Sequence, residues 1–314
     1  NFVGGSWSDV TPSVAALDQV SDVDQQAFFA ESQLQVTDQL ALVAGLRYDS
    51  IDTDYERLTY DAAGARDTSV DNSVNQSVDP LMSRLGFVYD ANATTAFYGQ
   101  YSTGETHPRG GDIVRVTDSL RESDTVTTRQ FEIGVKQLAM NDRLNWYLAY
   151  FDINRQNMLI DDPDNPDPTV FTTVPEQRSS GFELGGDLSV SSNLLVYANA
   201  SNLDSERDTG TEFVPTPYVA DTTINAGFLY RLNEQIRLGG DYRFVDERPY
   251  EDTPLPSYAV VDLSIGWVMS EQMSFTLNAK NIFDETYATA DHWTGGQWLV
   301  GQPRTLSITA DLDF

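Results

Sequence analysis

The chain has 314 residues, with 19 Lys plus Arg against 48 Asp plus Glu and a formal net charge of −29. So acidic a molecule repels phosphate backbones, which disfavours nucleic-acid binding. It has no cysteine and two histidines, His107 and His292. This excludes disulfides and thiolate metal sites, argues against a multi-histidine metal centre, and leaves no cofactor to be expected.

Alternation of apolar and polar residues with a period of two recurs along the chain and predicts β-strands. Thirteen strands are predicted, near residues 25–36, 40–52, 80–90, 94–104, 128–138, 143–155, 178–190, 193–204, 219–231, 235–246, 257–269, 272–282 and 303–314. In the last strand Leu306, Ile308 and Leu312 lie on one face, and the opposite face is wholly polar. No stretch approaches the roughly 18 consecutive apolar residues of a membrane helix. A membrane β-barrel needs no such stretch, because half of the residues in each strand face a polar interior.

The connections between these strands alternate in length. Six are tight turns, at residues 37–39, 91–93, 140–142, 191–192, 232–234 and 270–271, and six are long, at roughly 53–79, 105–127, 156–177, 205–218, 247–256 and 283–302. Short turns at one end and long loops at the other are typical of an outer-membrane barrel, with turns in the periplasm and loops outside. The pattern predicts an all-β, antiparallel transmembrane β-barrel. A soluble sandwich or propeller is the alternative, and no blade repeat supports it.

Strand counting predicts that the barrel is incomplete. Counting back from the last strand places residues 1–24 on the long-loop side. Single-chain bacterial barrels have even strand numbers and both ends in the periplasm. An open edge in lipid would leave backbone groups unpaired. We therefore expect residues 1–314 to be part of a longer protein, with at least one upstream strand missing.

Six short motifs carry a family resemblance. Asn281-Ile282-Phe283-Asp284-Glu285-Thr286-Tyr287 resembles the N-L-F-D-x-x-Y signature of TonB-dependent receptors, and Gly301-Gln302-Pro303-Arg304 resembles the G-x-P-R segment before their last strand. Phe314 is similar to the terminal aromatic residue that the outer-membrane assembly machinery reads. Segments 45–49, 131–136 and 180–183 resemble three strand motifs of the same family. The motifs follow the family's order over nearly the whole chain.

The resemblance implies a receptor in the outer membrane of a Gram-negative bacterium. Such a receptor has a 22-stranded, monomeric barrel occluded by an N-terminal plug. Residues 1–314 would form one domain, about the last 13 strands, without the plug and without the segment that contacts the TonB complex. The partners would be outer-membrane lipid, the TonB complex and a small ligand, with a ferric siderophore as the leading cargo. Cobalamin, another metal chelate or an oligosaccharide is the alternative cargo. A barrel enzyme using His107 or His292, and a purely structural barrel, are the other function classes.

Ligand contacts are expected from the long loops and the outer rim. Aromatic rings stack on planar ligand groups, and arginine binds anionic oxygen donors. The candidates are His107, Arg109 and Arg115, then Arg248 and Tyr250, then His292, Trp293 and Trp298. For each, a solvated loop arginine or an interface aromatic is the alternative reading.

The family motifs are expected to be structural. Asn281 and Asp284 would cap a turn through side-chain to backbone hydrogen bonds, and Gly301 and Pro303 would shape the chain before the last strand. The same structural role is expected of Phe283, Tyr287, Arg304 and Phe314.

Two groups of charged residues are predicted to have no ligand role. Segment 161–168 has four aspartates and one asparagine, but its three prolines and lack of glycine do not fit a calcium loop, so we expect a hydrated loop. Interior charges alternate in sign, so any cross-strand pairs among them would each contribute a fraction of a kcal/mol, and the charges are expected to seat the missing plug rather than touch substrate. These residues are Glu132, Lys136, Glu183, Asp187, Arg237, Asp241 and Arg243.

Overall fold

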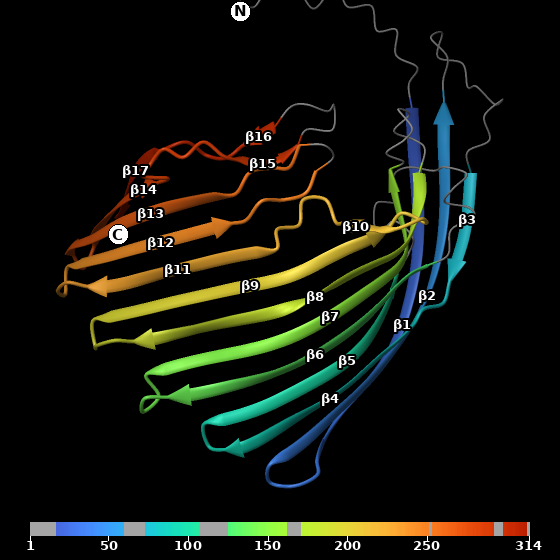
Figure 1. Cartoon of the computed structure of the whole chain (residues 1–314), viewed down its shortest axis with the longest axis horizontal. Coiled ribbons are helices and arrows are strands. Elements are labelled where there is room, and N and C mark those ends of the chain that lie inside the picture. Colours follow the sequence, from blue (N-terminus) through green and yellow to red (C-terminus); the bar gives the residue numbers. More distant parts are fainter. Residues whose placement is uncertain are drawn as a thin grey trace, which may run out of the picture.

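The computed structural model describes residues 17–59, 73–106, 125–161, 171–250, 253–291 and 298–312. Thirteen long strands lie side by side in chain order, each antiparallel to its neighbours (Figure 1). They are β1 (Leu17–Gln35), β2 (Leu40–Thr59), β4 (Leu81–Asn92), β5 (Thr95–Thr106), β6 (Val126–Ala139), β7 (Leu144–Asp161), β8 (Phe171–Ser189), β9 (Leu194–Asp208), β11 (Thr222–Arg231), β12 (Ile236–Val245), β13 (Tyr258–Ser270), β14 (Met273–Lys280) and β17 (Thr305–Leu312). The described part contains no helix that is long and apolar enough to cross a membrane.

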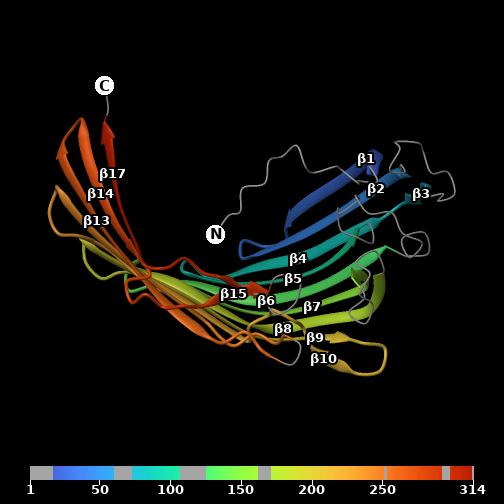
Figure 2. The same cartoon turned by 90° about the horizontal axis from the view of Figure 1, so that it is seen from above.

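All thirteen predicted strands are confirmed, and short turns join them at one end of the sheet. Four short strands in the predicted long loops were missed: β3 (Ser73–Val78), β10 (Phe213–Pro215), β15 (Ala288–Asp291) and β16 (Trp298–Val300). Strands β1, β2, β7, β8 and β9 also run further toward the long-loop end than predicted. The sheet is open within the described residues, with β1 and β17 at its edges, and it curves into a trough (Figure 2).

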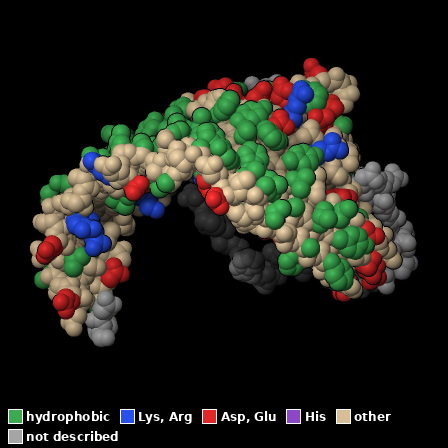
Figure 3. Space-filling model, turned by 90° about the horizontal axis from the view of Figure 1, so that it is seen from below, with side chains coloured by type: hydrophobic (Ala, Val, Ile, Leu, Met, Phe, Trp, Pro, Cys, Tyr) green, Lys and Arg blue, Asp and Glu red, His purple; other side chains and the backbone are tan. Residues whose placement is uncertain are grey.

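One face of the sheet is apolar. Tyr150 and Phe182 are cross-strand partners on it, with ring centroids 5.2 Å apart, and Phe182 is 55% exposed. On the same face Leu277 pairs with Ile308, which is 76% exposed. Hydrophobic side chains spread over the convex side of the trough (Figure 3). Because a water-soluble sheet buries such a face, this exposed convex face fits an apolar surrounding medium.

The concave face is polar, and glycines on it make room for tyrosines. Tyr147 lies directly opposite Gly185, where an added Cβ would come within 2.5 Å of the ring. The same arrangement pairs Tyr98 with Gly134 and Tyr197 with Gly227. Each ring covers the bare backbone of the next strand, so these glycines are packing positions.

The interior charges form no ion pairs with one another within the described residues. Asp241 accepts a hydrogen bond from the hydroxyl of Tyr197, and its partners in the register are Gly227 and Asp262, neither of them basic. Lys136 lies 5.1 Å from the ring centroid of Tyr98. The alternation of sign runs along single strands, whereas ion pairing depends on the register between strands, which the sequence does not state.

Candidate functional site: the loops of the long-loop end

Three connections meet at the long-loop end of the sheet: residues 209–221, 246–257 and 281–304. Alternation along β13 places Tyr258, Val260 and Asp262 on the concave face, since Val261 and Leu263 face the convex side. The backbone N–H of Asn281 donates to the Asp262 carboxylate at 2.8 Å. The start of the connection 281–304 therefore lies against the concave face.

Asn281 holds the first turn of this connection together. Its side chain is 3% exposed, its φ is 48°, and its Nδ2 donates to the carbonyls of Glu285 at 2.8 Å and Gln302 at 3.0 Å. Its Oδ1 accepts from the N–H of Glu285 at 2.9 Å. Asparagine tolerates this left-handed backbone and supplies both donors and acceptor. The turn-capping role predicted for Asn281 is what its geometry provides.

The other motif residues hold the end of this connection in place, just before β17. Asp284 accepts from the N–H of Arg304 at 2.9 Å and also pairs with its guanidinium at 3.4 Å. Gly301 lies against Tyr287, where a Cβ would come within 2.0 Å of the ring, and its N–H donates to the Tyr287 carbonyl. Pro303 separates these two contacts. Phe283 is 72% exposed, and the described residues give no reason for its place in the motif.

Arg248 is buried and held by backbone carbonyls. It is 6% exposed, and its two terminal nitrogens donate to the carbonyls of Ala288 at 2.7 Å and Thr289 at 2.9 Å. Its guanidinium carbon lies 5.4 Å from the ring centroid of Tyr258. Its Nε has no hydrogen-bond partner within the described residues. Arg248 thus joins the connection 246–257 to the hairpin of β15 and β16, and a ligand contact by this residue stays a prediction.

Aromatic pairs complete what we call the rim cluster: Tyr218, Arg248, Tyr250, Tyr258 and Tyr287. The rings of Tyr218 and Tyr250 stack with centroids 4.9 Å apart, and those of Tyr258 and Tyr287 with centroids 4.3 Å apart. Tyr218 has a φ of 65°, and its N–H donates to the carbonyl of Pro249 at 2.9 Å. A non-glycine residue in this backbone region is uncommon and persists only where its surroundings hold it.

Of the eight predicted ligand contacts, the structure brings Arg248 and Tyr250 into this cluster. Trp298 lies in β16 and is 44% exposed. His107, Arg109, Arg115, His292 and Trp293 lie outside the described residues, as do Phe314 and residues 162–168. Tyr218 and Tyr258 were not predicted as site residues, and Tyr287 was predicted only as a structural residue of the family motif. The signal of Tyr218 and Tyr258 in the sequence is only that each lies in or beside a long connection.

The rim cluster combines stacked phenol rings with one guanidinium on the concave side. The phenol rings can stack on planar groups and hydrogen-bond to oxygen-rich ligands, whereas the Arg248 guanidinium is already held by the carbonyls of Ala288 and Thr289. Tyr218 is 43% exposed, so this ring is open to solvent. Within the described residues no group of three or more acidic, histidine or cysteine side chains is placed to hold a metal ion.

Comparison with known proteins assigns the chain to a family. The family described as "TonB dependent receptor-like, beta-barrel" matches residues 1–282. The chain belongs to this family. The metal-pseudopaline receptor CntO of Pseudomonas aeruginosa strain UCBPP-PA14 is 25% identical over 306 residues, which cover 93% of this chain and 41% of that protein. The ferric-pyoverdine BN7/BN8 receptor of Pseudomonas putida is 26% identical over 308 residues, 93% of this chain and 35% of that receptor.

Solved structures share the fold. The closed form of the ferric-catecholate import receptor Fiu from Escherichia coli K12 superposes with a TM-score of 0.81 at 20% identity, over 94% of this chain and 45% of that structure. The chain therefore spans less than half the length of these relatives, and its curved sheet corresponds to part of a TonB-dependent receptor barrel.

Proposed function

We propose that this chain is the C-terminal barrel portion of an outer-membrane TonB-dependent receptor that takes up a ferric siderophore. The convex apolar face, over which Phe182 and Ile308 are mainly exposed, supports insertion in lipid. The family membership supports transport coupled to the TonB complex, which would contact the receptor outside residues 1–314.

The rim cluster is the observation that carries the cargo proposal. Stacked tyrosines, of which Tyr218 is open to solvent, suit a chelate with planar, oxygen-bearing groups. The names of the two sequence relatives, a ferric-pyoverdine receptor and a metal-pseudopaline receptor, point the same way. Another metal chelate, cobalamin or an oligosaccharide is the alternative cargo, since the same rings also stack on sugars.

Tryptophan quenching tests the cargo. Trp298 lies in the hairpin that Arg248 holds, so a bound chelate should quench its fluorescence in membrane-embedded receptor. We expect quenching by a ferric siderophore at micromolar concentration or below, loss of most of that signal in Trp298→Phe, and none with iron-free chelator at the same concentration. If an oligosaccharide quenches the fluorescence and no chelate does, the proposed iron uptake is refuted.

A second experiment addresses the enzyme class. Hydrolysis of lipid or peptide by the membrane-embedded protein that His292→Ala abolishes would favour an enzyme over a receptor. If the protein is a receptor, we expect no such hydrolysis. We also expect that growth which depends on uptake of the chelate is still measurable in His292→Ala.

A further inference from the structure

Two arginines on neighbouring strands face the trough near the long-loop end of the sheet. Arg155 on β7 and Arg207 on β9 are both direct cross-strand partners of Gln177 on β8, so the three residues form one row across the sheet. They face the concave side, because they alternate in step with Tyr147 on β7 and Tyr197 on β9. Neighbouring strands lie about 4.8 Å apart, so the two arginines start roughly 10 Å from each other and both guanidinium groups can reach one ligand between them.

Neither arginine of this row has an anionic partner within the described residues. Neither guanidinium forms an ion pair or a side-chain hydrogen bond there, and Nε of Arg207 is buried without a hydrogen-bond partner. The acidic residues adjacent in the chain face the convex side, where Glu206 pairs with Arg178 and Glu176 accepts from Asn154. A buried donor without an acceptor is uncommon and destabilising, so the row indicates an anion that comes from elsewhere.

A chain of hydroxyl groups connects this row to the rim cluster. Ser179 and Ser205 lie next to the row on β8 and β9 with their Oγ atoms 2.7 Å apart, and Ser205 Oγ donates to Oγ1 of Thr216 at 3.0 Å. The N–H of Thr216 donates to the Ser205 carbonyl at 2.8 Å, which holds the connection 209–221 against β9 just before Tyr218. The exposed ring of Tyr218 therefore lies in the segment that continues this polar strip.

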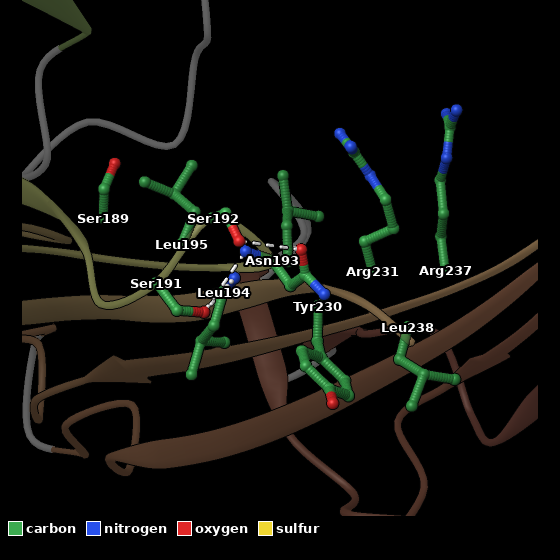
Figure 4. Close-up of a pocket in the computed structure, with 11 residues that line it drawn as sticks. Ser189, Ser191, Ser192, Asn193, Leu194, Leu195, Tyr230, Arg231, Arg237 and Leu238 are labelled. Carbon is green, nitrogen blue, oxygen red and sulfur yellow. Dashed lines mark hydrogen bonds between the residues drawn. The ribbon is translucent and has the colours of Figure 1, made fainter. Parts of the chain in front are cut away.

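The concave face has a second pair of arginines at the opposite end of its strands. Arg231 on β11 and Arg237 on β12 are direct cross-strand partners beside the short turns, and their side chains extend in the same direction (Figure 4). This pair also forms no ion pair in the described part of the chain. It has the same charge as the pair Arg155 and Arg207 but lies far from Tyr218, so it serves as a matched control.

We propose that Arg155 and Arg207 bind a free carboxylate of the cargo, so that the cargo is an acidic ferric chelate. Each guanidinium presents two parallel N–H donors that match the two oxygens of a carboxylate. Gln177 lies between them and adds amide N–H donors. The planar part of the same chelate stacks on the exposed ring of Tyr218. This assignment rests on the proposed function, because it names the chemical class of the proposed cargo.

The pair selects against chelates that lack the carboxylate. Such a chelate would shield both guanidinium groups from water and leave them unpaired, which is unfavourable. Hydrogen bonds between ionised groups are stronger than those between neutral groups. We therefore expect a chelate with a free carboxylate to bind at least about tenfold more tightly than the same chelate with that group converted to a methyl ester.

Paired ferric probes test this inference in the whole receptor, assembled in outer membranes. Ferric complexes of hydroxamate, catecholate and hydroxycarboxylate chelators are each prepared with one additional carboxylate, either free or as its methyl ester. Their Kd values are measured by quenching of Trp298. On the scaffold that binds, the acid should bind at least about tenfold more tightly than the ester. The double variant Arg155→Gln/Arg207→Gln should abolish this preference by weakening the acid, with the ester changed by less than about twofold.

The control variant removes the same charge elsewhere on the same face. Arg231→Gln/Arg237→Gln should keep the preference for the acid within about twofold of the parent, because it leaves the row at the long-loop end intact. Kd is compared only among variants that show the heat-resistant band of assembled receptor, so that a folding defect is not mistaken for lost binding. Equal binding of acid and ester by the parent, or an unchanged preference in Arg155→Gln/Arg207→Gln, would overturn the inference.

Chemical labelling separates direct contact from an indirect effect. Phenylglyoxal modifies exposed arginines, and Arg155 is exposed. The acid probe, at a concentration that saturates quenching of Trp298, should slow labelling of Arg155 severalfold and leave labelling of Arg237 unchanged. Quenching without protection of Arg155 would overturn this inference and leave the proposed function standing. If no ferric probe quenches Trp298, the proposed function is refuted and this inference with it.

Discussion

Replacing Asn281 should release the connection 281–304 without unfolding the sheet. The side chain makes three hydrogen bonds, to Glu285 twice and to Gln302 once, and it is buried. At about 1 kcal/mol net for each hydrogen bond, Asn281→Gly should lower the local opening free energy by about 3 kcal/mol. Glycine keeps the left-handed backbone, so this variant isolates the hydrogen bonds.

Asn281→Ala should cost more, because alanine also resists a φ of 48°. The left-handed conformation adds about 1 kcal/mol, for a total of roughly 4 kcal/mol. Hydrogen–deuterium exchange of membrane-embedded protein, read by mass spectrometry, measures both. A loss of about 3 kcal/mol corresponds to exchange roughly a hundredfold faster for the amides of Glu285, Gly301 and Arg304.

Asn233 provides the matched control. It caps an exposed short turn, where its Oδ1 accepts from the N–H groups of Gln235 at 2.9 Å and Ile236 at 2.8 Å. Asn233→Ala should accelerate exchange only in its own turn. Exchange in 281–304 that stays within threefold of the parent in Asn281→Gly, or that is equal in the glycine and alanine variants, would refute the reasoning.

Three further substitutions test packing, the convex face and the rim. Gly301→Ala drives a Cβ into the ring of Tyr287 and should destabilise the protein by about 1–3 kcal/mol, measured from the urea midpoint in lipid vesicles. Gly266→Ala is the control and should not destabilise the protein, because the nearest atom to its added Cβ lies 4.0 Å away. Leu184→Arg on the convex face should cost about 2–4 kcal/mol and lower assembly in the outer membrane, while Glu183→Arg on the concave face assembles; equal assembly of the two would contradict the orientation. Arg248→Lys keeps the charge but loses the planar fork, so exchange in β15 and β16 should accelerate and the chelate Kd should rise severalfold. An unchanged Kd together with unchanged exchange would exclude Arg248 from the rim.

The sequence predicted strands well wherever one face meets an apolar medium. Alternation is strong along β13, β14 and β17, and these strands lie near their predicted positions. It fails at the far ends of β1 and β2, where Asp22 and Asp24 pair with Asp54 and Asp52 on one face and polar and apolar residues are mixed on the other. Backbone pairing continues there without a hydrophobic signal, so the strands run on to Leu17 and Thr59.

The candidate site could be predicted less completely from the sequence than the strands could. Arg248 and Tyr250 were predicted from loop position and residue type alone. The stack of Tyr258 on Tyr287 joins residues 29 positions apart, and that of Tyr218 on Tyr250 joins residues 32 positions apart, as their numbers show. Such contacts depend on how three connections fold against one another, and no local pattern encodes that.

Unequal strand heights explain why the rim cluster forms where it does. Thr222, the first residue of β11, pairs with Asn202, but β9 continues to Asp208. At about 3.3 Å per residue, β9 rises roughly 20 Å beyond the end of β11. Its upper part is stiffened by β10 and by Arg178, which pairs with Glu206 at 3.1 Å and lies 3.8 Å from the ring centroid of Phe213.

The neighbouring strands β11, β12 and β13 end below this extended part of β9. Their connections have no sheet edge to extend, so their backbone groups must find partners within and between the loops. Arg248 and Leu255 exchange backbone hydrogen bonds within the connection 246–257, and the Arg248 side chain binds the carbonyls of Ala288 and Thr289 in the connection 281–304. Because Tyr258 and Asp262 face the concave side, the loops fold inward over the trough. The step between β9 and β11 thus leaves these connections to form a rim on one side of the trough, and this rim carries the stacked tyrosines.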